Sequence, residues 1–81
     1  MRARGRDQLG AGAMIYLRRE PARDNTVNKT DIVAYDSPTT ARAIARWPWH
    51  LSNRPHRGVK QVTVNNTRHP VVWLDYKGAP Q

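Results

Sequence analysis

A shortage of large aliphatic side chains limits this chain to a small hydrophobic core. Its 81 residues include four Leu, three Ile and seven Val, and no Phe. Together these make up about 17% of the chain, a share otherwise typical of disordered proteins. Three Trp and three Tyr partly replace the missing Phe, and the apolar residues are clustered along the sequence. Because a chain of this length has room for one core, we expect a single small domain.

The net charge favours an anionic partner. Lys and Arg number 14 against six Asp and Glu, which gives a formal charge of +8. A field of that sign attracts phosphates and carboxylates, so we expect the protein to bind nucleic acid or an acidic protein surface. The chain has no Cys, which excludes disulfides and thiolate metal ligands. No apolar run has the length of a membrane span, and polar residues follow the Arg-rich start where a signal peptide would be apolar. The sequence therefore predicts a cytoplasmic protein with no membrane contact.

The chain divides into three parts of different composition. Residues 1–13 are rich in Arg, Gly and Ala and show no periodicity, which predicts a disordered basic arm that the fold can do without. Residues 14–77 contain all the patterned segments and are expected to form the single domain. Residues 78–81 are expected to be a frayed tail. The arm either binds nucleic acid or has no role.

A helix between two pairs of strands is the predicted order of elements. Ser37 and Pro38 predict the start of the helix, because Ser is a good N-cap and Pro fits the first turn. We expect this helix to run to Trp47 and to end at Pro48. Alternating, β-branched and aromatic residues bounded by turn signals predict four strands, at residues 14–20, 30–36, 58–64 and 70–77. The predicted fold class is α+β, a four-stranded, mainly antiparallel sheet with one helix on one face, in the order β-β-α-β-β.

Catalytic and metal-binding chemistry is not expected from the polar residues. His50, His56 and His69 fall on predicted loops or element ends, and their spacing does not match a helical zinc pair. The Asp residues lie at the ends of predicted strands. We expect their side chains to pair with Arg rather than to act as general acids. We therefore expect no enzyme, no cofactor and no bound metal.

A basic stretch is the predicted partner-binding surface. No Asp or Glu lies between Asp36 and Asp75, which makes this the least balanced part of the chain. Arg42 and Arg46 are one turn apart on the predicted helix, so they are expected to face outward together. The predicted binding residues are Arg42, Arg46, Trp47, Arg54, Arg57 and Lys60.

The aromatic residues allow a second hypothesis, in which the protein binds DNA or RNA directly. Aromatic rings together with Arg hold single strands in several small folds. Trp47 and Trp49 flank Pro48 and are expected to be partly exposed, whereas most of the other rings are needed for the core. Under this hypothesis the additional nucleic-acid-binding residues are Arg2, Arg4, Arg6, Arg18, Arg68 and Lys77.

Three features carry a resemblance to a known family: the order of elements, the segment Ala41-Arg42-Ala43-Ile44-Ala45 and the segment Trp73-Leu74-Asp75-Tyr76-Lys77. In these features the chain resembles a family of small phage anti-CRISPR proteins. The resemblance covers residues 14–77. The family inhibits type I (I-F and I-C) CRISPR–Cas systems by binding the backbone subunits of the crRNA-guided surveillance complex (Cascade).

The resemblance implies that this chain blocks the binding and hybridisation of target DNA in the cytoplasm of the bacterial host cell. We expect a monomer rather than a dimer. Arg42 matches a basic helix position of the family pattern, whereas Ala43 stands where a basic residue is expected. Direct binding to DNA or RNA is the alternative function. A third hypothesis is a structural or assembly protein of a phage or ribonucleoprotein.

Overall fold

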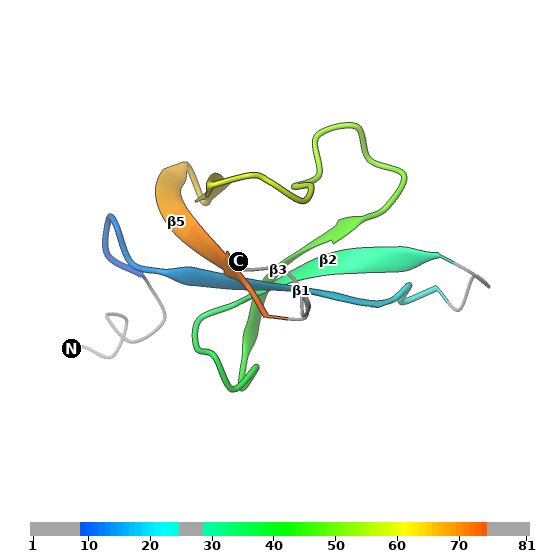
Figure 1. Ribbon diagram of the computed structural model, residues 1–81, viewed down its shortest axis with the longest axis horizontal. Helices are drawn as coiled ribbons and strands as arrows, with labels where there is room; N and C mark the ends of the chain where they lie inside the picture. Colours follow the sequence, from blue (N-terminus) through cyan, green and yellow to red (C-terminus); the bar gives the residue numbers. More distant parts are fainter. Residues whose placement is uncertain (1–8, 25–28, 75–81) are drawn as a thin grey trace.

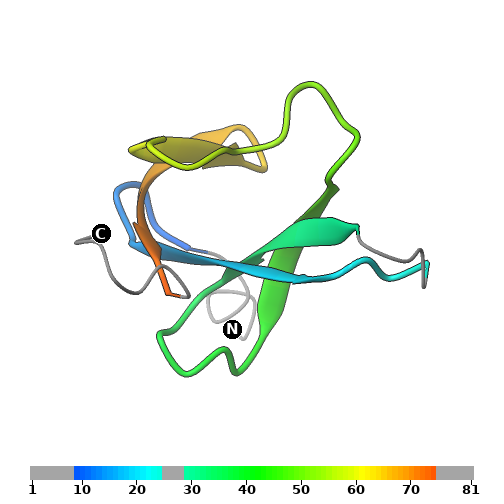
Figure 2. The ribbon, with the colours of Figure 1, turned by 45° about the vertical axis from the view of Figure 1, so that its right-hand side comes forward.

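Five strands form one curled, mixed sheet (Figures 1 and 2). The computed structural model describes residues 9–24 and 29–74. The strands are β1 (Ile15–Pro21), β2 (Thr30–Tyr35), β3 (Ala43–Pro48), β4 (Gln61–Val64) and β5 (Thr67–Trp73). Their order in the sheet is β3-β2-β1-β5-β4, with β1 and β5 parallel and the other neighbours antiparallel. Within the described ranges no segment is a helix with the length and apolarity needed to cross a membrane.

The predicted α+β fold class is wrong, because the segment predicted as the helix forms a turn followed by β3. Ser37 does not cap a helix; its carbonyl accepts a hydrogen bond from the Thr40 N–H at 3.2 Å, and its hydroxyl lies 2.9 Å from that of Thr39. Thr40 has a φ of 54°, which is outside the right-handed helical region. The Asp36 N–H then bonds the Arg42 carbonyl, closing the connection between β2 and β3. The four strands predicted from sequence overlap β1, β2, β4 and β5, but the sheet has a fifth strand and no helix lies on it in the described ranges.

The core explains why this segment becomes a strand. Trp47 lies opposite Ile32 and Ala45 lies opposite Ala34, so the core face of β2 continues onto β3. Without β3, one row of backbone groups on the fully buried part of β2 would have no partner. A helix of about nine residues is marginal on its own. The pairing with β2 therefore outweighs the local helix preference of the Ala-rich segment.

A bend in β5 curls the sheet. Its first half, Thr67–Pro70, pairs with β4, and its second half, Val71–Trp73, pairs in parallel with β1. Asn65 and Asn66 join β4 to β5 with φ angles of 53° and 66°, as a tight hairpin turn with two left-handed residues requires. Figure 2 shows β4 and β5 curving up from β1, with the connection from β3 to β4 leading across to them.

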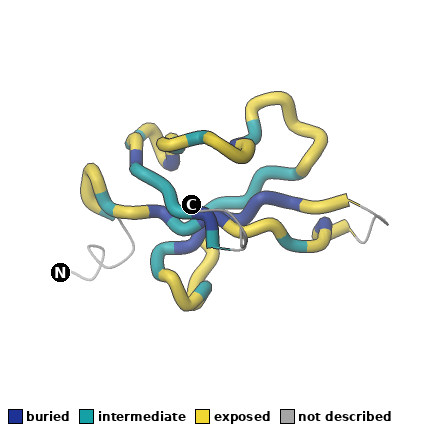
Figure 3. Tube along the Cα trace, viewed as in Figure 1, coloured by how far each residue is buried: buried dark blue, intermediate teal, exposed yellow. Residues whose placement is uncertain are grey.

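The core lies on one face of this curled sheet, called here the core face. Its buried centre consists of Ile15, Leu17, Ile32, Ala34 and Trp73. His69 is also buried, and its Nδ1 donates a hydrogen bond to the Ala13 carbonyl at 3.0 Å, which ties the segment before β1 to β5. Figure 3 shows the burial concentrated on the central strands, while the connections between strands are mostly exposed.

Candidate functional site

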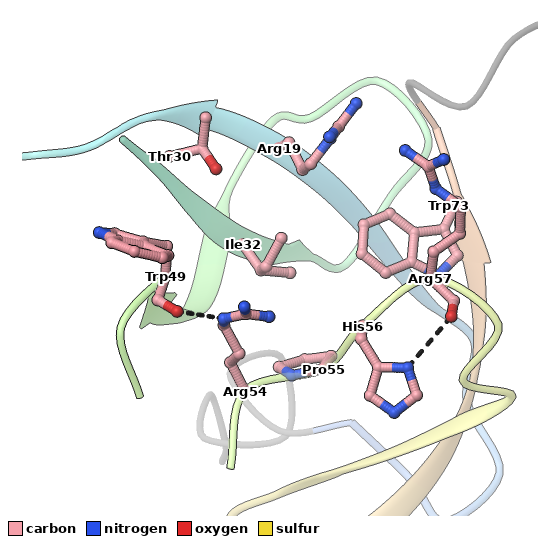
Figure 4. A pocket seen from close by; sticks show the side chains of 9 residues that line it. All are labelled: Arg19, Thr30, Ile32, Trp49, Arg54, Pro55, His56, Arg57 and Trp73. Carbon is pink, nitrogen blue, oxygen red and sulfur yellow. Dashed lines mark hydrogen bonds between the residues drawn. The ribbon is translucent and has the colours of Figure 1, made fainter. Parts of the chain in front are cut away.

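A groove lies where the connection between β3 and β4 meets the core face of the sheet. Its volume is about 260 Å³. The sheet contributes residues from β1, β2 and β5, and the connection contributes the remainder (Figure 4). The lining residues are Arg19, Thr30, Ile32, Trp49, Arg54, Pro55, His56, Arg57 and Trp73. We call this feature the Trp49 groove.

Strand alternation and pairing place the sheet residues of the groove. Successive side chains of a strand point to opposite faces, so Arg19 shares the core face with Leu17. Arg19 lies opposite Ile32 on β2, and Leu17 lies opposite Trp73 on β5. The parallel pairing of β1 with β5 therefore brings a guanidinium and an indole from distant parts of the chain to one place.

Local hydrogen bonds shape the connection that forms the other wall. The Leu51 N–H bonds the Pro48 carbonyl at 3.0 Å, and the Arg54 N–H bonds the Leu51 carbonyl at 3.4 Å, so the chain turns twice after β3. The Arg54 Nε donates to the Trp49 carbonyl, and the His56 Nδ1 donates to the Arg57 carbonyl at 3.1 Å. Pro55 is buried beneath these turns. These contacts hold the polar side chains of the connection at the groove, as Figure 4 shows.

Trp49 carries the more accessible of the two indole rings in the groove. It is 40% exposed, whereas Trp73 is only 8% exposed and forms part of the core. The Lys29 Nζ lies 5.3 Å from the centre of the Trp49 ring, within the range of a cation–π contact. An exposed indole beside several cations can stack a flat, electron-rich ring and attract an anion attached to it.

The groove is cationic, and none of the described residues that line it is acidic. Three of its lining residues are Arg, and Arg cannot lose its charge in a protein. Two acidic side chains lie instead on the opposite face of the sheet, in a group that we call the Arg46 cluster: Arg46, Asp31, Glu20 and Tyr35. The groove and the acids are thus separated by the sheet.

The Arg46 cluster is held by short polar contacts across three strands. Arg46 lies 2.7 Å from a carboxylate oxygen of Asp31 and 3.5 Å from one of Glu20. The Tyr35 hydroxyl donates a hydrogen bond to Glu20. That bond raises the pKa of Tyr35 above its ordinary value, because it stabilises the protonated phenol, and burial and the Glu20 charge add to the effect.

The predicted partner-binding residues do not form one surface. Arg46 is a member of the Arg46 cluster, with only 23% of its side chain exposed. Arg42 is exposed and lies 3.8 Å from Asp36. Trp47 packs against the core. Of the predicted set, the Trp49 groove brings together only Arg54 and Arg57.

The remaining predicted cations lie outside the groove. Lys60 is exposed before β4, and its carbonyl accepts a hydrogen bond from Val71 at 3.2 Å. Arg18 is exposed on the face opposite the core, and Arg68 is exposed on β5, 3.4 Å from Gln61. The other predicted nucleic-acid-binding residues, Arg2, Arg4, Arg6 and Lys77, lie outside the described residues.

Sequence reasoning left Arg19, Trp73 and His56 out of the site, and it did not include Trp49 among the binding residues. Alternation along β1 was enough to place Arg19 on the core face. Nothing local indicates that Trp73 would lie beside it, because the parallel pairing of β1 and β5 depends on the whole sheet. Among the described residues, no group of three or more His, Asp or Glu is arranged to hold a metal ion.

Comparison with protein-family models, with curated proteins and with solved structures finds no match to this chain.

Proposed function

We propose that the protein binds single-stranded nucleic acid in the Trp49 groove. The observation that carries this proposal is the meeting of an exposed indole with three guanidinium groups in a groove whose described lining residues include no acid. Single strands are commonly held by a cationic groove that follows the phosphates and by aromatic rings that stack the bases. The groove supplies both kinds of contact.

Stacking on Trp49 requires a base that is not already stacked in a duplex. Bases of a single strand can turn outward onto an aromatic side chain, and each base stacked in this way contributes about 1–3 kcal/mol. The Arg residues of the groove add contacts to phosphate, since a planar guanidinium can bind two oxygens at once. The stacking favours a single strand over a duplex of the same sequence, whereas the phosphate contacts are available with both.

The test is a fluorescence anisotropy titration of a labelled single strand of mixed sequence, and of the matching duplex, at several salt concentrations. We expect tighter binding to the single strand. The logarithm of the binding constant should fall with the logarithm of salt by about 0.7 for each phosphate that a cation neutralises. Trp49→Ala should weaken binding about tenfold or more, because it removes one stacking platform.

Two matched control variants distinguish binding in the groove from the general effects of an exposed apolar side chain or a surface charge. Leu51→Ala removes an apolar side chain that is 38% exposed on the same connection, outside the groove lining, and should leave affinity unchanged. Arg57→Gln should weaken binding and reduce the salt slope more than Arg68→Gln, which removes the same charge outside the groove. Tighter binding to the duplex, or equal effects of Trp49→Ala and Leu51→Ala, would contradict the proposal.

The anti-CRISPR hypothesis stays a prediction. It depended on a helix between two pairs of strands, and that segment is a turn followed by β3. Two of the residues assigned to its contact surface, Arg46 and Trp47, are engaged in the Arg46 cluster and in the core. No contact in the structure favours a protein complex over a nucleic-acid strand as the partner of the groove.

A further inference from the structure

We infer that Lys29 is a positioning residue of the Trp49 groove: its ammonium covers one face of the indole and holds the ring so that a base can stack on the other face. This inference rests on the proposed function and adds to it a residue that does not itself line the groove. It depends on the contact between the Lys29 ammonium and the Trp49 ring.

Backbone contacts hold Lys29 beside the groove. Its carbonyl accepts a hydrogen bond from the Ala22 N–H at 3.1 Å, directly after the end of β1. Thr30, the next residue, pairs with Pro21 and lines the groove together with Trp49 (Figure 4). The start of β2 therefore presents the Lys29 side chain to the ring from a main chain that is itself held by the sheet.

The Lys29 ammonium takes the place that a base would need on one face of the ring. Its Nζ lies over the ring, 5.3 Å from the ring centre. The centres of two stacked aromatic rings lie about 4.5–7 Å apart, which is the same range. A base can therefore stack on Trp49 without displacing Lys29 only on the opposite face.

The contact also restrains the direction of the ring. The Trp49 carbonyl is held by the Arg54 Nε, but a bond to the main chain leaves the side chain free to rotate. The attraction between the ammonium and the face of the indole limits this rotation, because it is lost when the ring turns away. A side chain that is already held in its binding conformation loses less freedom when the ligand binds.

The strength of the contact sets the size of the effect. A cation–π contact at an exposed site corresponds to about twofold to fivefold in an equilibrium constant. Apparent affinity falls in proportion to the fraction of molecules that are competent to bind. Lys29→Met keeps an unbranched side chain and removes the ammonium, so it should weaken binding by about this factor. Lys29→Arg keeps a cation that can lie over the ring, so it should bind nearly as well as the unchanged protein.

The experiment is a double-mutant cycle, measured by anisotropy titration of the full chain with a labelled single strand at low salt. Lys29→Met is introduced into the unchanged protein and into Trp49→Ala. The fall in affinity should be about twofold to fivefold larger in the unchanged protein, because Lys29 acts through the ring. Lys60→Met is the matched control, since Lys60 is an exposed Lys outside the groove lining, and its effect should be the same in both backgrounds.

Four results would contradict the inference. An equal effect of Lys29→Met in both backgrounds would show that Lys29 acts as a general charge, and tighter binding by Lys29→Met would show that Lys29 competes with the base for the ring. Binding by Lys29→Arg as weak as that by Lys29→Met would show that the cation over the ring is not the cause. These three results would leave single-strand binding standing, whereas absence of binding by the unchanged protein would overturn the proposed function and the inference with it.

Discussion

Removing the positive charge of Arg46 should strongly destabilise the fold. Arg46 lies 2.7 Å from Asp31, a residue that is only 3% exposed. Arg46→Met keeps much of the aliphatic length of the side chain and deletes the guanidinium. The Asp31 carboxylate then stays buried, and the hydrogen bond from the Arg23 N–H at 3.2 Å is its one remaining contact of this kind among the described residues.

The size of the effect follows from the burial of Asp31. Removing one partner of a buried ion pair typically costs about 3–5 kcal/mol, because it leaves an uncompensated charge. We expect the lower end, about 3 kcal/mol, for two reasons. Arg46 is 23% exposed, and its buried Nε, which has no partner among the described residues, is removed at the same time. For a small domain this lowers Tm by about 12 °C or more.

Thermal unfolding followed by circular dichroism measures the loss, with Arg42→Met as the matched control. Arg42 is exposed and lies 3.8 Å from Asp36, and screening by water limits such a surface pair to about 0–1 kcal/mol. The double variant Arg46→Met with Asp31→Asn should recover part of the stability lost in Arg46→Met. If Arg46→Met unfolds within about 3 °C of the unchanged protein, less than 1 kcal/mol of destabilisation, the structural role of the Arg46 cluster is refuted.

Two further substitutions test local features of the sheet. Tyr35→Phe removes the hydrogen bond to Glu20 and should cost about 1 kcal/mol at neutral pH. Because the folded protein raises the pKa of Tyr35, that stabilisation is fully present below about pH 10 and is lost as the pH rises through the folded-state pKa. Urea unfolding at pH 7 and at high pH should therefore show the difference between Tyr35→Phe and the unchanged protein shrinking, and a constant difference would be inconsistent with the contact. Thr40→Gly should raise the stability by about 1 kcal/mol, because a β-branched residue at a φ of 54° is strained; a loss of stability in urea unfolding would show that Thr40 is not strained.

The strands that could be predicted are those with strong local patterns. Alternating residues marked β1, and β-branched and aromatic residues marked β2. The gap predicted between the last two strands, residues 65–69, contains the turn at Asn65 and Asn66, but β5 begins at Thr67 rather than at Pro70. β3 could not be predicted in this way. Its Ala-rich sequence follows a Ser-Pro pair and locally favours a helix, and the reason that it is a strand is its pairing with β2.

In the candidate site, too, local sequence predicted some residues and pairing between strands placed the others. Arg54 and Arg57 were predicted from an unbalanced run of charge, and the partial exposure predicted for Trp49 is confirmed at 40%. Arg46 was misplaced because the predicted helix put it beside Arg42, whereas in a strand it meets the carboxylates of β1 and β2. Arg19 joins the groove through pairing between strands that are distant in the sequence, and the pattern of a single sequence does not reveal such pairing.

The most direct test of the central claim locates the bound strand on the protein. In a ¹H–¹⁵N correlation spectrum the three Trp side chains give three indole N–H signals that can be followed during titration with a thymidine oligonucleotide. We expect the Trp49 indole signal to shift most, together with the backbone amides of Arg54 and Arg57, while those of Thr39 and Thr40 stay in place. Shifts confined to Thr39, Thr40 and Arg18 would place the ligand elsewhere and contradict the assignment of the Trp49 groove as the binding site.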